Sequence, residues 1–235
     1  MIVSNKNINI SPSNKFAVII PAKNEEKRLP ETLKALGTQV KVIVVDGSSD
    51  DKTIEVAKKL GADVISSQPS RGLQLHLGAQ RATEEWLIFL HADTVLSAGW
   101  LTEVMEFVNN PASKSKVGFF KFKLDDESFF SKICELTVFL RNLIFCIPYG
   151  DQGLLIRKDL YISLGGYKQI PLMEDLDMSI KIGRKRFKPI NVEAVTSGLR
   201  YKKNGYIYQS LKNFLCFFMY FLGFPLNWIV WIYDK

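Results

Sequence analysis

The segment FAVIIPAKNEE, residues 16–26, begins as an apolar run of β-forming residues and changes at Pro21 into a short polar loop. Two later apolar runs end in the same way, VKVIVV at residues 40–45 and WLIFL at residues 86–90. Helical patterns lie between the three runs. This alternation favours an α/β fold with a parallel sheet and right-handed crossovers.

The residues that follow the three runs carry amide or carboxylate groups. Asn24 follows the first run, Asp46 the second and Asp93 the third. In open α/β sheets, ligands bind in a crevice outside the carboxyl ends of the strands. We therefore expect these three side chains to converge on one binding crevice.

Periodicity and capping signals predict the remaining elements. Helices are expected over residues 30–36, 50–60, 72–84, 100–108, 129–145, 158–164 and 174–182, and strands over 64–65, 117–124 and 154–156. The sequence contains no internal repeat and no recognisable interdomain linker, which indicates a single domain of 235 residues.

The net charge of +7 is concentrated in two basic clusters, KIGRKRFK at residues 181–188 and RYKK at residues 200–203. These clusters form either a solvated face or a surface that attracts phosphates of a ligand or membrane. No RNA- or DNA-binding motif accompanies them, so nucleic acid is not an expected partner. Three cysteines without a zinc-ligand pattern, and no signal peptide, favour a reducing, cytoplasmic location.

Residues 214–232 are almost continuously apolar, although Gly223, Pro225 and Asn227 interrupt them. The length reaches the lower edge of a membrane span, roughly 17–25 residues. The proline and asparagine argue against a span, and the aromatic residues near its end suit a membrane interface. Three interpretations stay open: a helix docked on the inner face of an anionic membrane, an ordinary core segment, and a true span.

Four motifs occur in order along the chain: PAKNE (21–25), VVDGSSDDKT (44–53), HADT (91–94) and MED (173–175). Together they resemble a family 2 glycosyltransferase with the A-type nucleotide-sugar fold, over residues 15–200. The set FLHADT, PYGDQG, LGGY and PLMED is similar to a small subgroup of that family found around accessory biosynthetic gene clusters. The resemblance implies a single-domain α/β fold with a mostly parallel central sheet flanked by helices.

The same resemblance divides the chain into three parts. Residues 1–14 would be a disordered tail, residues 15–205 the glycosyltransferase catalytic domain, and residues 206–235 an apolar helical segment able to associate with a membrane.

The resemblance implies that the first loops hold the nucleotide of a UDP-sugar or GDP-sugar donor. The pocket for the base and ribose would be lined by Pro21, Ala22, Asn24 and Glu25. Asp46 would bind the base, since a carboxylate accepts hydrogen bonds from ring N–H and hydroxyl groups. Asp46 could instead cap its own loop. Arg71, in SRGLQ, resembles the basic residue that meets the diphosphate.

The resemblance also implies a divalent cation, Mn²⁺ or Mg²⁺, bound by Asp93. Hard oxygen ligands suit both ions. His91 stands where the family commonly has another acidic residue. Either the substrate phosphates would supply most of the other ligands, or His91 itself would touch the metal or the ribose, or it would simply pack locally.

The catalytic base is assigned by the resemblance to the pair Glu174 and Asp175, with Asp175 as the base. A carboxylate at a helix start can take a proton from an acceptor hydroxyl, although it can also serve as a cap. Asp151 and Gln152, in PYGDQG, and Arg200 would contact the acceptor or the phosphates. A plain tight turn at Asp151 and Gln152 is the alternative.

The implied reaction is an inverting, metal-dependent transfer of a sugar to an acceptor hydroxyl. The Gln-x-x-Arg-Trp motif of processive synthases is absent after Asp175, which favours a single addition. The acceptor is not identified, and a lipid-linked acceptor would follow from membrane docking. The alternative is a catalytically weak or inactive, membrane-docked scaffold that binds nucleotides.

Overall fold

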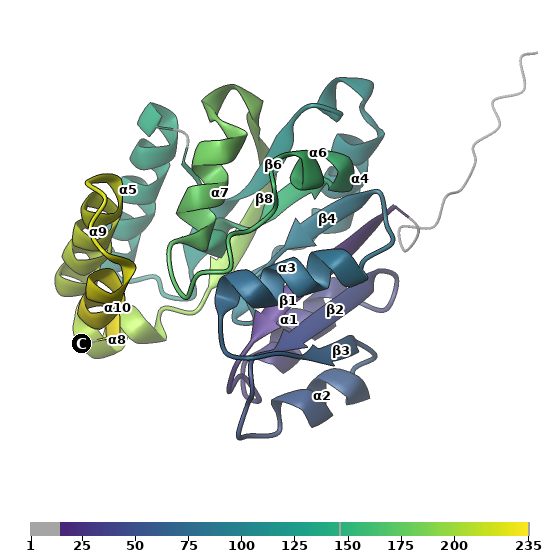
Figure 1. Ribbon diagram of the computed structural model, residues 1–235, viewed down its shortest axis with the longest axis horizontal. Coiled ribbons are helices and arrows are strands. Elements are labelled where there is room, and N and C mark those ends of the chain that lie inside the picture. The colour runs from purple at the N-terminus through teal and green to yellow at the C-terminus, as the bar shows by residue number, and fades with distance from the viewer. Residues whose placement is uncertain (1–14, 146, 235) are drawn as a thin grey trace, which may run out of the picture.

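A computed structural model describes residues 15–145 and 147–234 of the chain (Figure 1). The strands are β1 (Phe16–Ala22), β2 (Lys41–Asp46), β3 (Asp63–Ser66), β4 (Trp86–Phe89), β5 (Thr94–Leu96), β6 (Val117–Leu124), β7 (Leu154–Arg157) and β8 (Phe187–Thr196). The helices are α1 (Leu29–Leu36), α2 (Thr53–Lys59), α3 (Arg71–Arg81), α4 (Trp100–Asn109), α5 (Phe129–Phe145), α6 (Lys158–Ser163), α7 (Glu174–Ile182), α8 (Leu199–Asn204), α9 (Tyr206–Phe221) and α10 (Leu226–Asp234). The tail expected at residues 1–14 lies outside the described residues.

The described residues form one eight-stranded sheet in the order β3-β2-β1-β4-β7-β6-β8-β5. The strands from β3 to β4 are parallel, as the sequence predicts. β7 then runs antiparallel to both of its neighbours, β8 is parallel to β6, and β5 is antiparallel to β8. The predicted α/β fold with a mostly parallel sheet is therefore confirmed, and its second half is mixed.

Two strands, β5 and β8, were not expected from the sequence. In β8 the side chains of Ile190, Val192 and Ala194 are buried and alternate with more exposed ones, which is the period of a half-buried strand. Pro189 and the preceding basic residues obscure this pattern, because proline and lysine are uncommon in strands.

Helices cover both faces of the sheet. One core cluster packs α1, α2 and α4 against one face, around buried side chains such as Phe16, Leu33 and Trp100. The second cluster packs α3, α6 and α7 against the other face, around Leu75, Tyr161 and Met178. These layers fix where each strand ends, and so where the polar loops lie.

The C-terminal helices gather at one end of the molecule beside α5 (Figure 1). The apolar segment 214–232 is not one helix: α9 ends at Phe221 and α10 begins at Leu226. Gly223 has a φ of 75° and Pro225 cannot donate a helical hydrogen bond, so the chain turns between them. None of the described helices is long and apolar enough to cross a membrane, which leaves the true-span interpretation without support.

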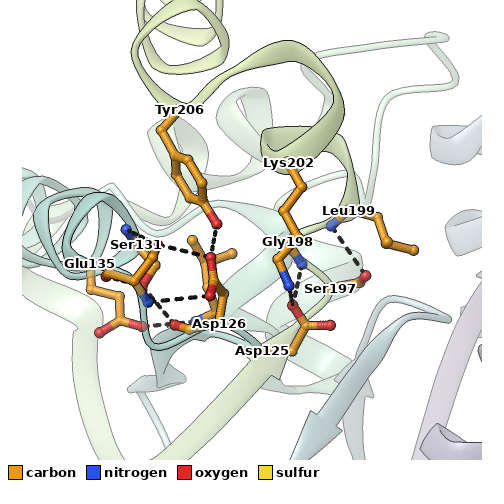
Figure 2. A network of polar contacts seen from close by, with 11 residues as sticks. Asp125, Asp126, Ser131, Glu135, Ser197, Gly198, Leu199, Lys202 and Tyr206 are labelled. Atoms are coloured by element: carbon orange, nitrogen blue, oxygen red, sulfur yellow. Dashed lines mark hydrogen bonds and ion pairs between the residues drawn. The ribbon is translucent and has the colours of Figure 1, made fainter.

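A polar network anchors α5, α8 and α9 to the ends of β6 and β8 (Figure 2). Asp125 accepts a hydrogen bond from Gly198 N at 2.7 Å, and Asp126 accepts one from the Tyr206 hydroxyl. Glu135 of α5 accepts from Leu124 N at 3.0 Å. The network joins segments about 70–80 residues apart in sequence, so the C-terminal helices are held firmly to the sheet.

Gln74 of α3 links the ends of the neighbouring strands β1 and β2. Its side chain is buried, and its amide nitrogen donates to the carbonyls of Ala22 at 3.0 Å and Val45 at 2.8 Å. Both carbonyls lie where polar loops begin. The bond pair therefore sets the spacing of the β1 and β2 ends.

Replacing Gln74 with methionine keeps the volume and removes both donors. The Val45 carbonyl then loses this donor and the Ala22 carbonyl keeps only its bond from Gly47 N at 2.8 Å, at a cost of about 1–3 kcal/mol in the free energy of unfolding. Urea titration should show this loss for Gln74→Met, whereas Gln80→Met, at an exposed position of the same helix, should stay within about 0.5 kcal/mol of wild type. Equal stability of the two variants would contradict the role given to Gln74.

Candidate active site

The loops after β1 and β2 are tied to each other. Asn24, with a φ of 56°, donates its N–H to Ser49 Oγ at 2.9 Å and accepts from Asp50 N at 2.9 Å. The buried Asp46 carboxylate accepts from Ser49 N at 3.0 Å and from Ser49 Oγ at 2.5 Å. Both polar side chains thus take part in shaping the loops.

A cavity of about 240 Å³ opens beyond the ends of β1 and β4. It brings together many of the residues singled out in the sequence: Pro21, Glu25, Arg71, His91, Asp93, Asp151, Asp175 and Arg200. Other residues singled out there do not belong to its lining, namely Ala22, Asn24, Asp46, Gln152 and Glu174. The predicted convergence of strand ends on one crevice therefore includes Asp93, whereas Asn24, in the loop after β1, and Asp46, at the end of β2, do not line the cavity.

The cavity wall carries arginines as well as carboxylates. Arg28 binds Glu25 with two hydrogen bonds, of 2.7 and 2.9 Å, and lines the cavity beside it. Burial raises the pKa of Glu25, and the Arg28 charge opposes that rise. Burial also raises the pKa of Asp93, against the charges of Arg28, Arg71 and Arg200. Sequence reasoning missed Arg28, although its spacing of three residues from Glu25 was a possible signal.

His91 is held as a neutral imidazole. Burial, together with the positive charges of Arg71 and Arg200, lowers its pKa to about 3. Its Nε2 packs against Gly150, where an added Cβ would lie 2.6 Å away. A side chain at position 150 would displace the His91 ring, and His91 can offer a lone pair or a single N–H to the cavity.

Glu174 and Asp175 begin α7 but point to different places. Glu174 is 1% exposed and pairs with Arg71, at 3.5 Å between Oε1 and Nη1. Asp175 lines the cavity, and its carboxylate accepts hydrogen bonds from Gly150 N at 2.8 Å and Leu176 N at 2.7 Å. Asp175 is therefore the member of the pair that can reach a ligand in the cavity.

Asp151 and Gln152 also differ. Gln152 is buried and accepts from Arg141 and Asn142, at 3.0 Å each, so it organises the protein interior. Asp151 lines the cavity, and its Oδ1 is buried without a hydrogen-bond partner among the described residues. Burial raises its pKa to about 6, while the Arg141 charge opposes that rise.

The C-terminal helices complete the wall. Gln209 and Asn213 of α9 and Tyr233 of α10 line the cavity. The Tyr233 hydroxyl accepts a hydrogen bond from Arg200, whose Cζ lies 5.1 Å from the Tyr233 ring centroid. The apolar C-terminal segment, expected to dock on a membrane, join the core or span a membrane, is thus flanked by residues of the candidate site.

The described residues contain no group of three or more His, Cys, Asp or Glu side chains that could hold a metal ion. Asp93 offers one hard oxygen ligand to the cavity, with neutral His91 nearby. These residues fit a divalent cation only together with oxygens from a bound ligand, such as a diphosphate.

The family model of glycosyl transferase family 2 matches residues 17–157, more than half of the chain. The chain belongs to glycosyl transferase family 2. The match covers the sheet from β1 to β7 and the residues Arg71, Asp93 and Asp151; Asp175 and the C-terminal helices lie beyond it.

A curated relative is 4,4'-diaponeurosporenoate glycosyltransferase of Staphylococcus haemolyticus, which is 40% identical over 93 residues. The match covers 35% of this chain and 25% of the relative, so the chain spans about a quarter of that relative's length.

Two solved structures share the fold of this family 2 member. TarS 1–349 of S. aureus in complex with UDP-GlcNAc has a TM-score of 0.60 at 20% identity, covering 77% of this chain and 58% of TarS 1–349. The second is glucosyl-3-phosphoglycerate synthase of Mycobacterium tuberculosis in complex with Mn²⁺, UDP and glucosyl-3-phosphoglycerate. It has a TM-score of 0.60 at 16% identity, and the match covers 90% of this chain and 81% of the synthase chain.

The buried Glu174 makes stability depend on pH. Burial and the neighbouring Asp175 raise its pKa to about 7, although Arg71 opposes the rise. Between the unfolded pKa of about 4.5 and the folded value, the folded state binds more protons, so the free energy of unfolding falls as pH rises. The raised pKa of Asp151 likewise makes the free energy of unfolding fall as pH rises.

Urea unfolding at about pH 5 and about pH 7.5 checks this. The free energy of unfolding of the wild type should be lower at about pH 7.5 than at about pH 5, and the decrease should be clearly smaller for Glu174→Gln. Glu106→Gln, at an exposed position of α4, should follow wild type. A Glu174→Gln variant with the wild-type pH dependence would show that Glu174 is ionised throughout.

Proposed function

We propose that this protein transfers a glycosyl group from a UDP-sugar, or a GDP-sugar, to an acceptor hydroxyl. The observation that carries the proposal is the single cavity in which Asp93 and three arginines, Arg28, Arg71 and Arg200, lie together with Asp175. Support comes from family membership and from two structures of the same fold, one in complex with UDP-GlcNAc and the other with UDP.

The arginines would bind the diphosphate, since guanidinium groups match phosphate oxygens in geometry and charge. Asp175 would take the proton of the acceptor hydroxyl as its oxygen forms the bond to the anomeric carbon. The bond from that carbon to the diphosphate breaks in the same step, and UDP leaves with the bonding electrons. Attack from the side opposite the leaving group inverts the anomeric configuration, and one sugar is added per encounter.

Asp93 would hold Mn²⁺ or Mg²⁺ together with the diphosphate oxygens. Such a cation neutralises the negative charge that develops on the leaving group. Mn²⁺ occurs with UDP in the glucosyl-3-phosphoglycerate synthase structure, which supports this assignment.

The alternative of an inactive nucleotide-binding scaffold rests on His91 in place of an acidic residue. Release of free UDP from a UDP-sugar separates the two, because a scaffold would bind the donor without turning it over.

Nucleotide binding should stabilise the folded protein. At about 100 times its dissociation constant, UDP with Mn²⁺ should add about 2.7 kcal/mol, and each kcal/mol raises the melting temperature by roughly 2–4 °C. Asp93→Asn should remove only the part of the shift that depends on Mn²⁺. Asp159→Asn, at an exposed carboxylate of α6, is the matched control. The absence of a thermal shift with UDP or GDP, both with and without Mn²⁺, would count against the proposal.

Removing the basicity of Asp175 should slow the chemical step. Asp175→Asn keeps the shape of the side chain, so the UDP-induced thermal shift should persist while kcat falls about 10²–10⁴-fold, the usual worth of general base catalysis. Release of UDP from a donor panel measures the rate. Turnover of Asp175→Asn near the wild-type value would show that Asp175 is not the base and serves only as a structural cap.

We also propose that the enzyme docks on the inner face of an anionic membrane. Helices α5, α9 and α10 and the turn after α9 expose many large apolar side chains, among them Leu143 of α5 at 62% and Leu222 of the turn at 71%. Soluble monomers rarely expose such extended apolar surface. Lys202 and Lys203 are exposed, whereas Lys212 is only 7% exposed and lies near the rings of Tyr208 and Tyr233.

Sedimentation with vesicles that contain anionic lipid at low salt tests docking. The full chain should sediment, and Leu143→Glu with Leu222→Glu should release it, because charge on an apolar face opposes burial in the interface. Ile162→Glu carries the same change at 63% exposure on α6, away from this face, and should sediment as wild type. If the double variant sedimented as completely as Ile162→Glu, the assigned docking surface would be wrong.

A further inference from the structure

A second cavity, of about 430 Å³, lies between α5 and α9. We call it the α5–α9 groove. Its lining is largely apolar and includes Val138, Ile144, Leu211, Phe214 and Phe217. Its volume falls within the range of about 300–1,000 Å³ that small-molecule sites occupy.

The groove continues into the candidate active site. Tyr149, Asp151, Tyr201 and Asn213 line both cavities, so they form a common wall. The groove is thus a second approach to the residues around Asp175, from the side of the C-terminal helices.

The inner end of the groove is polar. Asp151 Oδ1 is buried without a hydrogen-bond partner among the described residues, and so is Arg141 Nε. The Arg141 guanidinium lies 3.6 Å from the centroid of the Tyr149 ring. A buried carboxylate oxygen without a partner loses free energy that a ligand hydroxyl would restore. A ligand in the groove should therefore carry its hydroxyl at this end.

The outer part of the groove belongs to the apolar surface. The same two helices expose large apolar side chains around it, such as Leu140, Ile144, Leu211 and Phe214. The groove therefore runs from an apolar exterior to a polar interior, which matches a molecule with a hydrocarbon chain and one polar end.

The walls are fixed to the sheet and to each other. Tyr206 at the start of α9 binds Asp126, and Glu135 of α5 binds Leu124 N (Figure 2). Cys134 Sγ and Ser210 Oγ, from the two walls, lie 3.4 Å apart. The groove is thus bounded by anchored helices.

We infer that the α5–α9 groove holds the hydrocarbon chain of a membrane-borne amphiphilic acceptor, whose hydroxyl end lies at Asp151 beside Asp175. This inference rests on the proposed transferase function and names its acceptor class. A hydrophilic sugar or peptide would leave the apolar lining unmatched. A second copy of the chain, or a segment outside the described residues, could also cover the groove, and the experiment separates these occupants.

The test uses the full chain and a dodecanol that carries a photoreactive diazirine in mid-chain. After irradiation below the aggregation limit of the alcohol, peptide mass spectrometry should place the label on α5 and α9 residues that line the groove. Unlabelled dodecanol should compete, and butanol should not, because it buries too little apolar surface.

Two variants fill the groove. Val138→Trp and Thr137→Trp replace lining residues and should abolish labelling of the groove. Leu215→Trp adds the same bulk at an exposed position of α9 outside the lining and should keep it. Having two filling variants guards against one of them failing to fold, which circular dichroism reports.

Several results would overturn the inference. Label spread over the exposed faces of α9 and α10, or label insensitive to both filling variants, would show that the groove is not the site. A dimer in solution whose interface protects α5 and α9 would assign the groove to a second copy, and label blocked until residues 1–14 are removed would assign it to that segment.

The UDP-induced thermal shift is measured on the same samples. A normal shift without groove labelling refutes the acceptor site and leaves the transferase proposal standing. Groove labelling without any nucleotide shift refutes the transferase proposal instead, and with it the identification of the ligand as an acceptor.

Discussion

The contact between Arg71 and Glu174 is the interaction on which the candidate site depends. It joins the start of α3 to the start of α7, at 3.5 Å and with Glu174 almost fully buried. Removing Arg71 would leave the buried Glu174 carboxyl without the charge that opposes the rise of its pKa. Gly72 reinforces the junction, because an added Cβ would lie 2.0 Å from the carbonyl oxygen of Lys168. The junction places Asp175 against Gly150 and on the same cavity as Asp93.

Much of the nucleotide-side half could be predicted from the sequence. Parallel strands buried on both faces give continuous apolar runs, so β1, β2 and β4 stand out, and with them the loop that contains Asp93. The rest depends on contacts between distant segments. Neither β8, which contains Pro189, nor the role of Arg28 carries a strong local signal. The bonds from Ser49 to Asp46 and the separate environments of Glu174 and Asp175 become visible only once the loops and helices are packed.

The C-terminal helices link the chemistry to the surface. The sequence shows an apolar stretch at residues 214–232, but the residues that join it to the site include Asn213 and Tyr233, polar side chains that flank the stretch at its two ends. Helix α5, predicted from the sequence as an apolar helix, also exposes many large apolar side chains. One group of helices therefore closes the candidate active-site cavity, lines the α5–α9 groove and forms the apolar face, so that the proposed donor binding, acceptor entry and membrane docking would share the same elements.

The position of UDP in a crystal structure of the full chain, grown with UDP and Mn²⁺, tests the central claim most directly. The account predicts the diphosphate in the cavity beside Asp93, in contact with at least one of Arg28, Arg71 and Arg200, with the side of Asp175 left open for an acceptor. A nucleotide bound elsewhere on the molecule, with the cavity filled only by solvent, would contradict it.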